Sequence, residues 1–223
     1  MSGIVLALDT ATRATAAAVL VGDDCVERRL EGGAGRPAHA GGLLPLAAEC
    51  LAELGCGFGD VDRVAVCVGP GSFTGIRAGV ATAAGLARGC GADLVGVGSL
   101  RALLAGAREA GIEGPLVAAI DARRRELFLA GGDADGDAGA ACVLPLSWIE
   151  GFAAGGRTWV GDGALLARDA IELQGGFVPP EEDRCHRILA SVIAGLASSP
   201  DVNGDAVAPV YLRKPDAVPA GGS

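Results

Sequence analysis

Aromatic residues and lysine are scarce in this sequence of 223 residues: Phe, Trp and Tyr together make up 4%, and Lys214 is the only lysine. The bulk of a core must therefore come from Leu, Val, Ile and Ala. Basic residues are in the minority as well, because 18 Lys and Arg face 27 Asp and Glu, which gives a net charge of −9. A protein that binds nucleic acid alone is usually basic, since each phosphate contact needs a cation. The charge balance therefore speaks against unaided binding of RNA or DNA.

Metal ligands and export signals are equally sparse. There are two histidines, His39 and His186, and neither has a second histidine at helical spacing. The seven cysteines include no C-x-x-C pair, and their odd number is typical of free thiols in a reducing compartment. The amino terminus has no basic region before its first apolar run, and no apolar run reaches membrane-spanning length. We therefore expect a cytoplasmic chain without a signal peptide, a membrane segment or a metal site.

What the sequence does contain is an α/β pattern that occurs twice. The first half predicts strands at 4–8, 15–21, 25–30, 61–68 and 94–97, and helices at 43–54, 74–88 and 99–110, the last of them capped by Ser99. The second half predicts strands at 116–120, 127–130, 142–144 and 158–160, and helices at 164–173 and 187–196. Each half opens with strand, Asp turn and strand, so we expect two duplicated βββαβα units. We place the two lobes at residues 1–110 and 111–223, with a frayed tail after Lys214.

Two aspartates, Asp9 and Asp121, end the first strand of each half and are expected to face the cleft between the lobes. They could hold Mg²⁺ for a nucleotide, as in actin-like ATPases. Such sites need a glycine-rich hairpin beside the Asp so that phosphate can approach the backbone, and here larger residues follow both aspartates. The alternative is that both carboxylates cap their turns by accepting hydrogen bonds from nearby N–H groups. No catalytic residue is predicted.

The most distinctive stretch, residues 69–77, reads GPGSFTGIR and joins a strand to a helix. Glycine-rich loops at such positions bind phosphate through backbone N–H groups. The Lys-Ser/Thr pair of a Walker A loop is missing, however, and Lys214 is far away in the sequence. The alternative, which physical reasoning favours, is a tight turn in which Ser72 or Thr74 caps the helix and Phe73 is exposed.

The predicted helices at 43–54 and 74–88 carry more apolar and small surface than one sheet requires. The first has two adjacent apolar stripes, and the second has small residues on nearly every side, which lets another helix approach closely. These faces are either buried within the chain or form an interface with a partner protein. The candidates for such an interface are His39, Leu43, Leu44, Ala47, Leu51, Phe73, Ile76, Gly79 and Ala83.

At residues 69–77 the sequence closely resembles the bacterial TsaB (YeaZ) family. The resemblance extends to the segment 6–12 (LALDTAT), to His39 with 43–45 (LLP), to 119–123 (AIDAR) and to 209–213 (PVYLR). These blocks occur in the family's order over nearly the whole chain. The glycine-rich block is highly specific, whereas the opening block is shared with many actin-like folds.

The resemblance implies a two-lobed actin/hexokinase/Hsp70-like (ASKHA) fold. It also implies a role in making N6-threonylcarbamoyladenosine (t6A) at position 37 of tRNAs that read ANN codons. In that family the paralogue TsaD carries the paired metal histidines and binds the threonylcarbamoyl-adenylate, and the ATPase TsaE joins the pair. This chain would then be a non-catalytic subunit whose first two helices meet their counterparts on TsaD.

Further expectations follow from the same resemblance. ATP, threonylcarbamoyl-adenylate and metal are expected on the partner subunits rather than on this chain, and tRNA is expected to bind only through the complex. The chain alone could form a homodimer through the same helix face. Two alternatives of another class are an autonomous ASKHA-fold ATPase and a metallopeptidase like the M22 glycopeptidases. The missing phosphate glycines and metal histidines speak against both.

Overall fold

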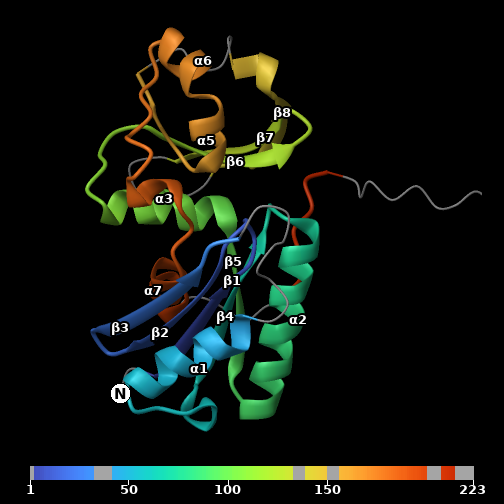
Figure 1. Ribbon diagram of the computed structural model, residues 1–223, viewed down its shortest axis with the longest axis vertical. Helices are drawn as coiled ribbons and strands as arrows, with labels where there is room; N and C mark the ends of the chain where they lie inside the picture. Colours follow the sequence, from blue (N-terminus) through green and yellow to red (C-terminus); the bar gives the residue numbers. More distant parts are fainter. Residues whose placement is uncertain (1–2, 33–41, 133–138, 150–155, 200–206, 214–223) are drawn as a thin grey trace, which may run out of the picture.

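The computed structural model describes residues 3–32, 42–132, 139–149, 156–199 and 207–213, which form two β-sheets with helices between and outside them (Figure 1). The first sheet has the strand order β3-β2-β1-β4-β5. Its strands are β1 (Val5–Asp9), β2 (Thr15–Val21), β3 (Asp24–Leu30), β4 (Arg63–Gly69) and β5 (Asp93–Gly98). The second sheet has the order β8-β7-β6-β9. Its strands are β6 (Leu116–Arg123), β7 (Glu126–Gly132), β8 (Cys142–Pro145) and β9 (Thr158–Val160).

The two sheets repeat one arrangement. In the first, β1 pairs antiparallel with β2 and parallel with β4. In the second, β6 pairs antiparallel with β7 and parallel with β9. The predicted duplication of an α/β unit is therefore visible in the strand order, although the described part of the second sheet has no counterpart of β5.

Helices cover both faces of each sheet. The α-helices are α1 (Leu43–Glu53), α2 (Phe73–Cys90), α3 (Ser99–Glu109), α5 (Asp162–Leu166), α6 (Arg168–Leu173) and α7 (Ala190–Ser198), and the 3-10 helices are η1 (Phe58–Asp60), η2 (Leu146–Trp148) and η3 (Arg184–His186). α1 and α2 cover the outer face of the first sheet, and α3 lies between the two sheets (Figure 1). α5 and α6 cover the outer face of the second sheet. Among the described residues, no helix is long and apolar enough to cross a membrane.

Both faces of the central strands are buried, and this explains their nearly continuous apolar sequences. In β1, Leu6 and Leu8 pack beneath α1 and α2, whereas Val5 and Ala7 belong to the core between the sheets. β6 divides its side chains in the same way between that central core and the core beneath α5 and α6. A period of two therefore distributes small and branched side chains to two cores at once.

The last helix connects the halves of the chain. α7 packs on β1 and β2 of the first sheet although it follows the second sheet in sequence. Its N-terminal turn is held by Glu27 of β3, whose carboxylate accepts hydrogen bonds from the N–H of Ala190 (3.2 Å) and from the N–H (3.0 Å) and hydroxyl (2.7 Å) of Ser191. The division between residues 110 and 111 stays a prediction, but a lobe that ends at residue 110 leaves out this helix.

Most predicted elements are present within a few residues of their expected limits, and four details differ. Ser99 does not cap α3, because Gly98 takes the N-cap position and the Ser99 hydroxyl turns inward to the Cys67 thiol at 3.0 Å. The strand predicted to end at residue 120 runs on to Arg123. The single helix predicted at 164–173 is interrupted at Ala167, and the helix predicted to begin at residue 187 begins at Ala190.

Candidate functional site

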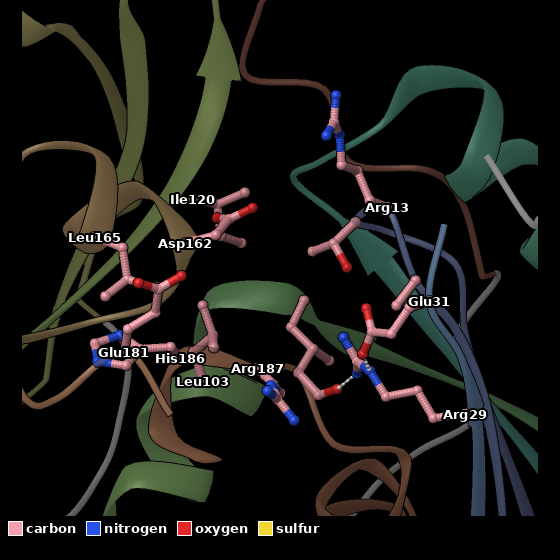
Figure 2. Close-up of a pocket in the computed structure, with 13 residues that line it drawn as sticks. Arg13, Arg29, Glu31, Leu103, Ile120, Asp162, Leu165, Glu181, His186 and Arg187 are labelled. Carbon is pink, nitrogen blue, oxygen red and sulfur yellow. Dashed lines mark hydrogen bonds and ion pairs between the residues drawn. The ribbon is translucent and has the colours of Figure 1, made fainter. Parts of the chain in front are cut away.

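A pocket of about 250 Å³ lies between the two sheets (Figure 2). The β1–β2 turn, β3, α3, β6, α5 and the segment before α7 all contribute to its lining. Its charged lining residues are balanced in sign: Arg13, Arg29, Arg187, Glu31, Asp162 and Glu181. This balance provides no concentration of positive charge for the phosphates of a nucleotide.

Several of these charges are already engaged within the chain. Nε of Arg29 pairs with Glu31 at 2.6 Å, and its NH1 donates to the carbonyl oxygen of Ile188 at 3.0 Å. Burial raises the pKa of Asp162, whose Oδ1 accepts a hydrogen bond from the N–H of Asp121 at 3.1 Å. Of these contacts, the one from Arg29 to Ile188 joins β3 to the segment before α7, and the one between Asp162 and Asp121 lies within the second lobe.

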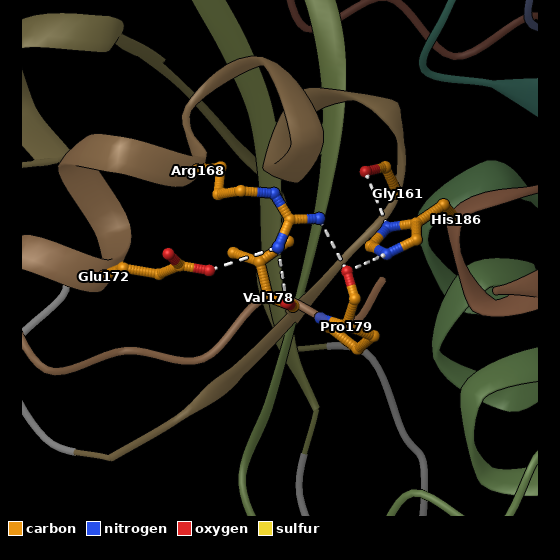
Figure 3. Close-up of polar contacts among 6 residues, drawn as sticks. All are labelled: Gly161, Arg168, Glu172, Val178, Pro179 and His186. Atoms are coloured by element: carbon orange, nitrogen blue, oxygen red, sulfur yellow. Dashed lines mark hydrogen bonds and ion pairs between the residues drawn. The ribbon is translucent and has the colours of Figure 1, made fainter. Parts of the chain in front are cut away.

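One wall of the pocket is fixed by His186 and Arg168 (Figure 3). The His186 ring is buried, with Nδ1 3.2 Å from the carbonyl oxygen of Gly161 and Nε2 3.0 Å from that of Pro179. Arg168 donates to the carbonyl oxygens of Val178 (2.7 Å) and Pro179 (2.6 Å). Both nitrogens of His186 face backbone oxygens, so the ring serves the structure here and is not presented to a metal. No group of three or more His, Cys, Asp or Glu within the described ranges could hold a metal ion.

Asp9 and Asp121 cap their turns, as the second interpretation of the sequence held. Oδ1 of Asp9 accepts from the N–H of Ala11 at 2.9 Å, and Oδ1 of Asp121 accepts from the N–H of Arg123 at 2.8 Å. Neither residue lines the pocket described above. Asp9 is fully buried, and burial raises its pKa to about 6. A carboxylate in that position is closed off from solvent by the chain itself.

The glycine-rich loop before α2 packs closely against the β1–β2 turn. Ser72 is the N-cap of α2, with its hydroxyl accepting from the N–H of Gly75 at 3.3 Å, and Phe73 is exposed, as predicted. The N–H of Ser72 donates to the carbonyl oxygen of Ala11 at 2.7 Å. A Cβ atom at Gly71 would collide with that same oxygen. The N–H of Ser72 is therefore engaged by the β1–β2 turn rather than offered to a phosphate.

Phe73 and Arg77 of α2 form a cluster with Tyr211 that sequence reasoning missed. The Arg77 guanidinium lies 3.8 Å from the centre of the Phe73 ring, and its Nε donates to the Tyr211 hydroxyl at 2.8 Å. The two rings are 5.1 Å apart between centroids. The 209–213 block was matched to the family, but the partners lie 134 positions apart in sequence, and no local pattern signals such a contact.

The structure separates the predicted interface residues into three groups. Six of them face their own sheet and are buried: Leu43, Ala47, Leu51, Ile76, Gly79 and Ala83. Leu44 and Phe73 are exposed, and His39 lies outside the described residues. The six buried side chains leave no surface for a partner, because small and branched residues pack closely against the strands of this chain. The outer faces of the two helices instead present Leu44, Ala48, Ala81, Ala84 and Gly85.

Comparisons with known proteins give a consistent result. Residues 34–143 match the family model described as "TsaD: tRNA N6-adenosine threonylcarbamoyltransferase". The chain is 39% identical over 124 residues to the tRNA threonylcarbamoyladenosine biosynthesis protein TsaB of Haemophilus influenzae, covering 55% of this chain and 51% of that one. It is 34% identical over 221 residues to an uncharacterised protein of Mycobacterium leprae, covering 97% and 56%. The chain thus spans about half the length of the curated relatives it matches.

Solved structures agree over the whole described fold. YeaZ from Pseudomonas aeruginosa superposes with a TM-score of 0.75 at 27% identity, covering 94% of this chain and all of that chain. A second structure from the same species, described as similar to the peptidase YeaZ, gives a TM-score of 0.73 at 29% identity.

Proposed function

This chain is a member of the TsaB (YeaZ) family and has its two-lobed ASKHA fold, and from that membership we propose that it is a non-catalytic subunit in t6A biosynthesis. In this role it dimerises with TsaD and activates it for modification of adenosine 37 in tRNAs that read ANN codons. It works in the cytoplasm, where tRNA modification takes place. TsaE joins the pair, and the chain forms a homodimer when TsaD is absent.

The outer face of α1 and α2 is the observation that carries this proposal. Leu44 is 48% exposed, and Ala48, Ala81, Ala84 and Gly85 lie on the same outer side of the first sheet. A Cβ atom built on Gly85 would meet nothing within 4 Å. Small residues on exposed helices let a second pair of helices approach closely, and the central part of such an interface excludes water.

A relationship with TsaD explains what would approach this face. A segment of 63 residues is 48% identical to the tRNA N6-adenosine threonylcarbamoyltransferase of Cereibacter sphaeroides, and the TsaD family model covers both α1 and α2. Two chains with related helices can pack them about a pseudo-two-fold axis, which gives an isologous type of interface. The same geometry allows two copies of this chain to pair.

Three features of the site support a non-catalytic role. Asp9 is enclosed by the chain, the N–H of Ser72 in the glycine-rich loop is engaged by the β1–β2 turn, and the pocket between the sheets has balanced charges. The chemistry is therefore assigned to the partners: TsaD holds the metal and the threonylcarbamoyl-adenylate, and TsaE hydrolyses ATP.

Leu44→Arg tests the partner face, with Leu173→Arg as its matched control. Both leucines are exposed helix residues, but Leu173 lies on α6, on the far side of the second sheet. An arginine at position 44 would be desolvated against TsaD, so we expect the affinity for TsaD to fall at least about 30-fold, or about 2 kcal/mol. Calorimetric titration of TsaD with the folded variants measures this. Equal affinities for Leu44→Arg and Leu173→Arg would contradict the assignment of the face.

A further inference from the structure

The tip of the β6–β7 hairpin consists of three consecutive arginines in an unfavourable backbone conformation. Arg123, Arg124 and Arg125 have φ angles of 64°, 56° and 61°, and all three are exposed. Hairpin turns with positive φ at both loop positions normally contain Asn and Gly. Left-handed backbone costs roughly 1–2 kcal/mol for each residue that carries a Cβ.

Strain of this kind is retained when the side chains serve a purpose that Asn and Gly cannot. The hairpin is anchored despite its tip, because β6 and β7 pair continuously from Leu116↔Gly132 to Asp121↔Leu127, with a register shift before the last pair, Arg123↔Glu126. Asp121 also holds Arg123 through an ion pair at 2.9 Å. The fold therefore holds a tight turn whose three arginines are all exposed.

The same surface continues to the N-terminus of α2. Arg213 pairs with Glu126, the residue that follows the hairpin tip, at 2.7 Å. Two residues earlier, Tyr211 lies against Phe73 and accepts the hydrogen bond from Arg77. Leu212 packs against the central core between them. In Figure 1 this segment passes from α2 of the first lobe towards the end of the second sheet.

We call this surface the basic–aromatic strip and define it by Arg77, Arg123, Arg124, Arg125, Tyr211 and Arg213. Its five arginines outnumber the acidic residues beside it: Asp121 pairs with Arg123, Glu126 pairs with Arg213, and Asp162 lies next to Asp121. Arg77 uses one of its five donors on Tyr211. The strip is therefore positive in a chain whose net charge is −9.

We propose that the basic–aromatic strip is an RNA-binding surface, which contacts the phosphate backbone of tRNA through its arginines and offers the Tyr211 ring to a base. This rests on the proposed function, which brings tRNA to the complex. Guanidinium groups match phosphate oxygens in a forked geometry, and exposed aromatic rings stack with unpaired bases. An acidic protein surface would use the arginines alone, whereas an RNA also brings bases that can stack on the exposed part of the Tyr211 ring.

The strip is too small to bind tRNA alone against the charge of the whole chain. A few phosphate contacts give weak, salt-sensitive binding, and repulsion from the acidic remainder opposes it. The strip contacts the tRNA once TsaD holds it, because binding to TsaD raises the local concentration of tRNA at the strip. This explains how a subunit with an acidic composition can still contribute to RNA affinity.

The double variant Arg124→Asn/Arg125→Gly tests the proposal, because it removes two charges and relieves the strain at the same time. We expect its melting temperature to rise, since Asn and Gly suit the turn. We expect the affinity of its complex with TsaD for tRNA to fall about tenfold near 0.1 M salt. The slope of log K against log salt should become less steep by roughly 0.7–0.9 for each phosphate that the variant no longer binds.

The control is Arg184→Asn/Arg187→Asn, which removes two exposed arginines outside both the strip and the outer face of α1 and α2, and leaves the same net charge as the hairpin variant. Its complex should keep the tRNA affinity and the salt slope of the parent. The proposal would be overturned if the complex of the hairpin variant had the same tRNA affinity and salt slope as the parent complex. It would also be overturned if the variant bound TsaD less well while the complex that still formed bound tRNA as the parent complex does. If the parent complex forms no t6A, the proposed function fails instead, and the two failures are distinguishable.

Discussion

Asp9 and Asp121 occupy equivalent positions in the two sheets, and each accepts a hydrogen bond from the backbone N–H two residues further along the chain. Asp9 ends β1 and Asp121 lies near the end of β6, the strands that pair antiparallel with β2 and β7. The environments differ, because Asp9 is fully buried whereas Asp121 also pairs with Arg123. The same turn thus occurs in both lobes, with a buried carboxylate in the first lobe and a partly exposed one in the second.

Asp9→Asn should stabilise the protein at neutral pH. Burial raises the pKa of Asp9 to about 6, above the ordinary value of 3.8, so the folded state binds a proton that the unfolded state has released. The contribution of Asp9 to the free energy of unfolding therefore falls by roughly 3 kcal/mol as the pH rises from about 4 to about 6, and this contribution is constant above that range. Asparagine still accepts the bond from the N–H of Ala11 and carries no charge.

Urea unfolding at about pH 4 and at about pH 7.5 measures this effect. We expect a gain of about 1–3 kcal/mol at the higher pH and little change at the lower one. Asp121→Asn is the control and should show no such gain, because Asp121 is ion-paired with Arg123. A stability difference between Asp9→Asn and the parent that does not depend on pH would contradict the assigned cause.

Two glycines of α2 should respond in opposite directions to alanine. A Cβ atom at Gly79 would collide with the Thr10 hydroxyl, which itself donates to the carbonyl oxygen of Gly75 at 2.7 Å. We expect Gly79→Ala to destabilise by about 1–3 kcal/mol. Gly85→Ala meets open space in the same helix and should stabilise by roughly 0.5–1 kcal/mol. Thermal unfolding of both variants checks this, and equal shifts would refute the close packing of Gly79 on the β1–β2 turn.

Glu27→Ala should release α7 from the first sheet. The carboxylate caps the N-terminus of α7 with three hydrogen bonds, while the N-cap residue Leu189 has no side-chain cap of its own. We expect a loss of about 1–3 kcal/mol, with part of it restored in Glu27→Gln. Glu49→Ala, on the exposed side of α1, should lie within about 0.5 kcal/mol of the parent. Hydrogen exchange in α7 that is unchanged in Glu27→Ala would contradict the capping role.

Local sequence signals predicted the elements well and their packing less well. β2 was predicted at its observed limits because turn residues bound it on both sides. Gly55, which follows the helix predicted at 43–54, adopts a left-handed conformation with φ 70°. The direction that a helix face takes is a tertiary property. Ile76 and Ala83 were assigned to a partner surface, but small residues pack equally well on the chain's own sheet.

The contacts that define the site join residues far apart in sequence, and composition gives no sign of them. Glu27 meets Ser191 across 164 positions, and Arg77 meets Tyr211 across 134. The strained backbone of the arginine hairpin was equally hidden, because Arg has no preference for a left-handed turn. The family blocks at 69–77 and 209–213 were both identified, yet only the structure places them against each other.

The most direct test of the proposed function is t6A formation on tRNA by TsaD and TsaE with and without this chain. The tRNA is incubated with ATP and threonylcarbamoyl-adenylate. It is then digested, and its nucleosides are quantified by mass spectrometry. We predict that t6A forms only when this chain is present, and that this chain with tRNA but without TsaD forms none. Formation of t6A at the same rate without this chain, or by this chain alone, would contradict its role as a non-catalytic activating subunit.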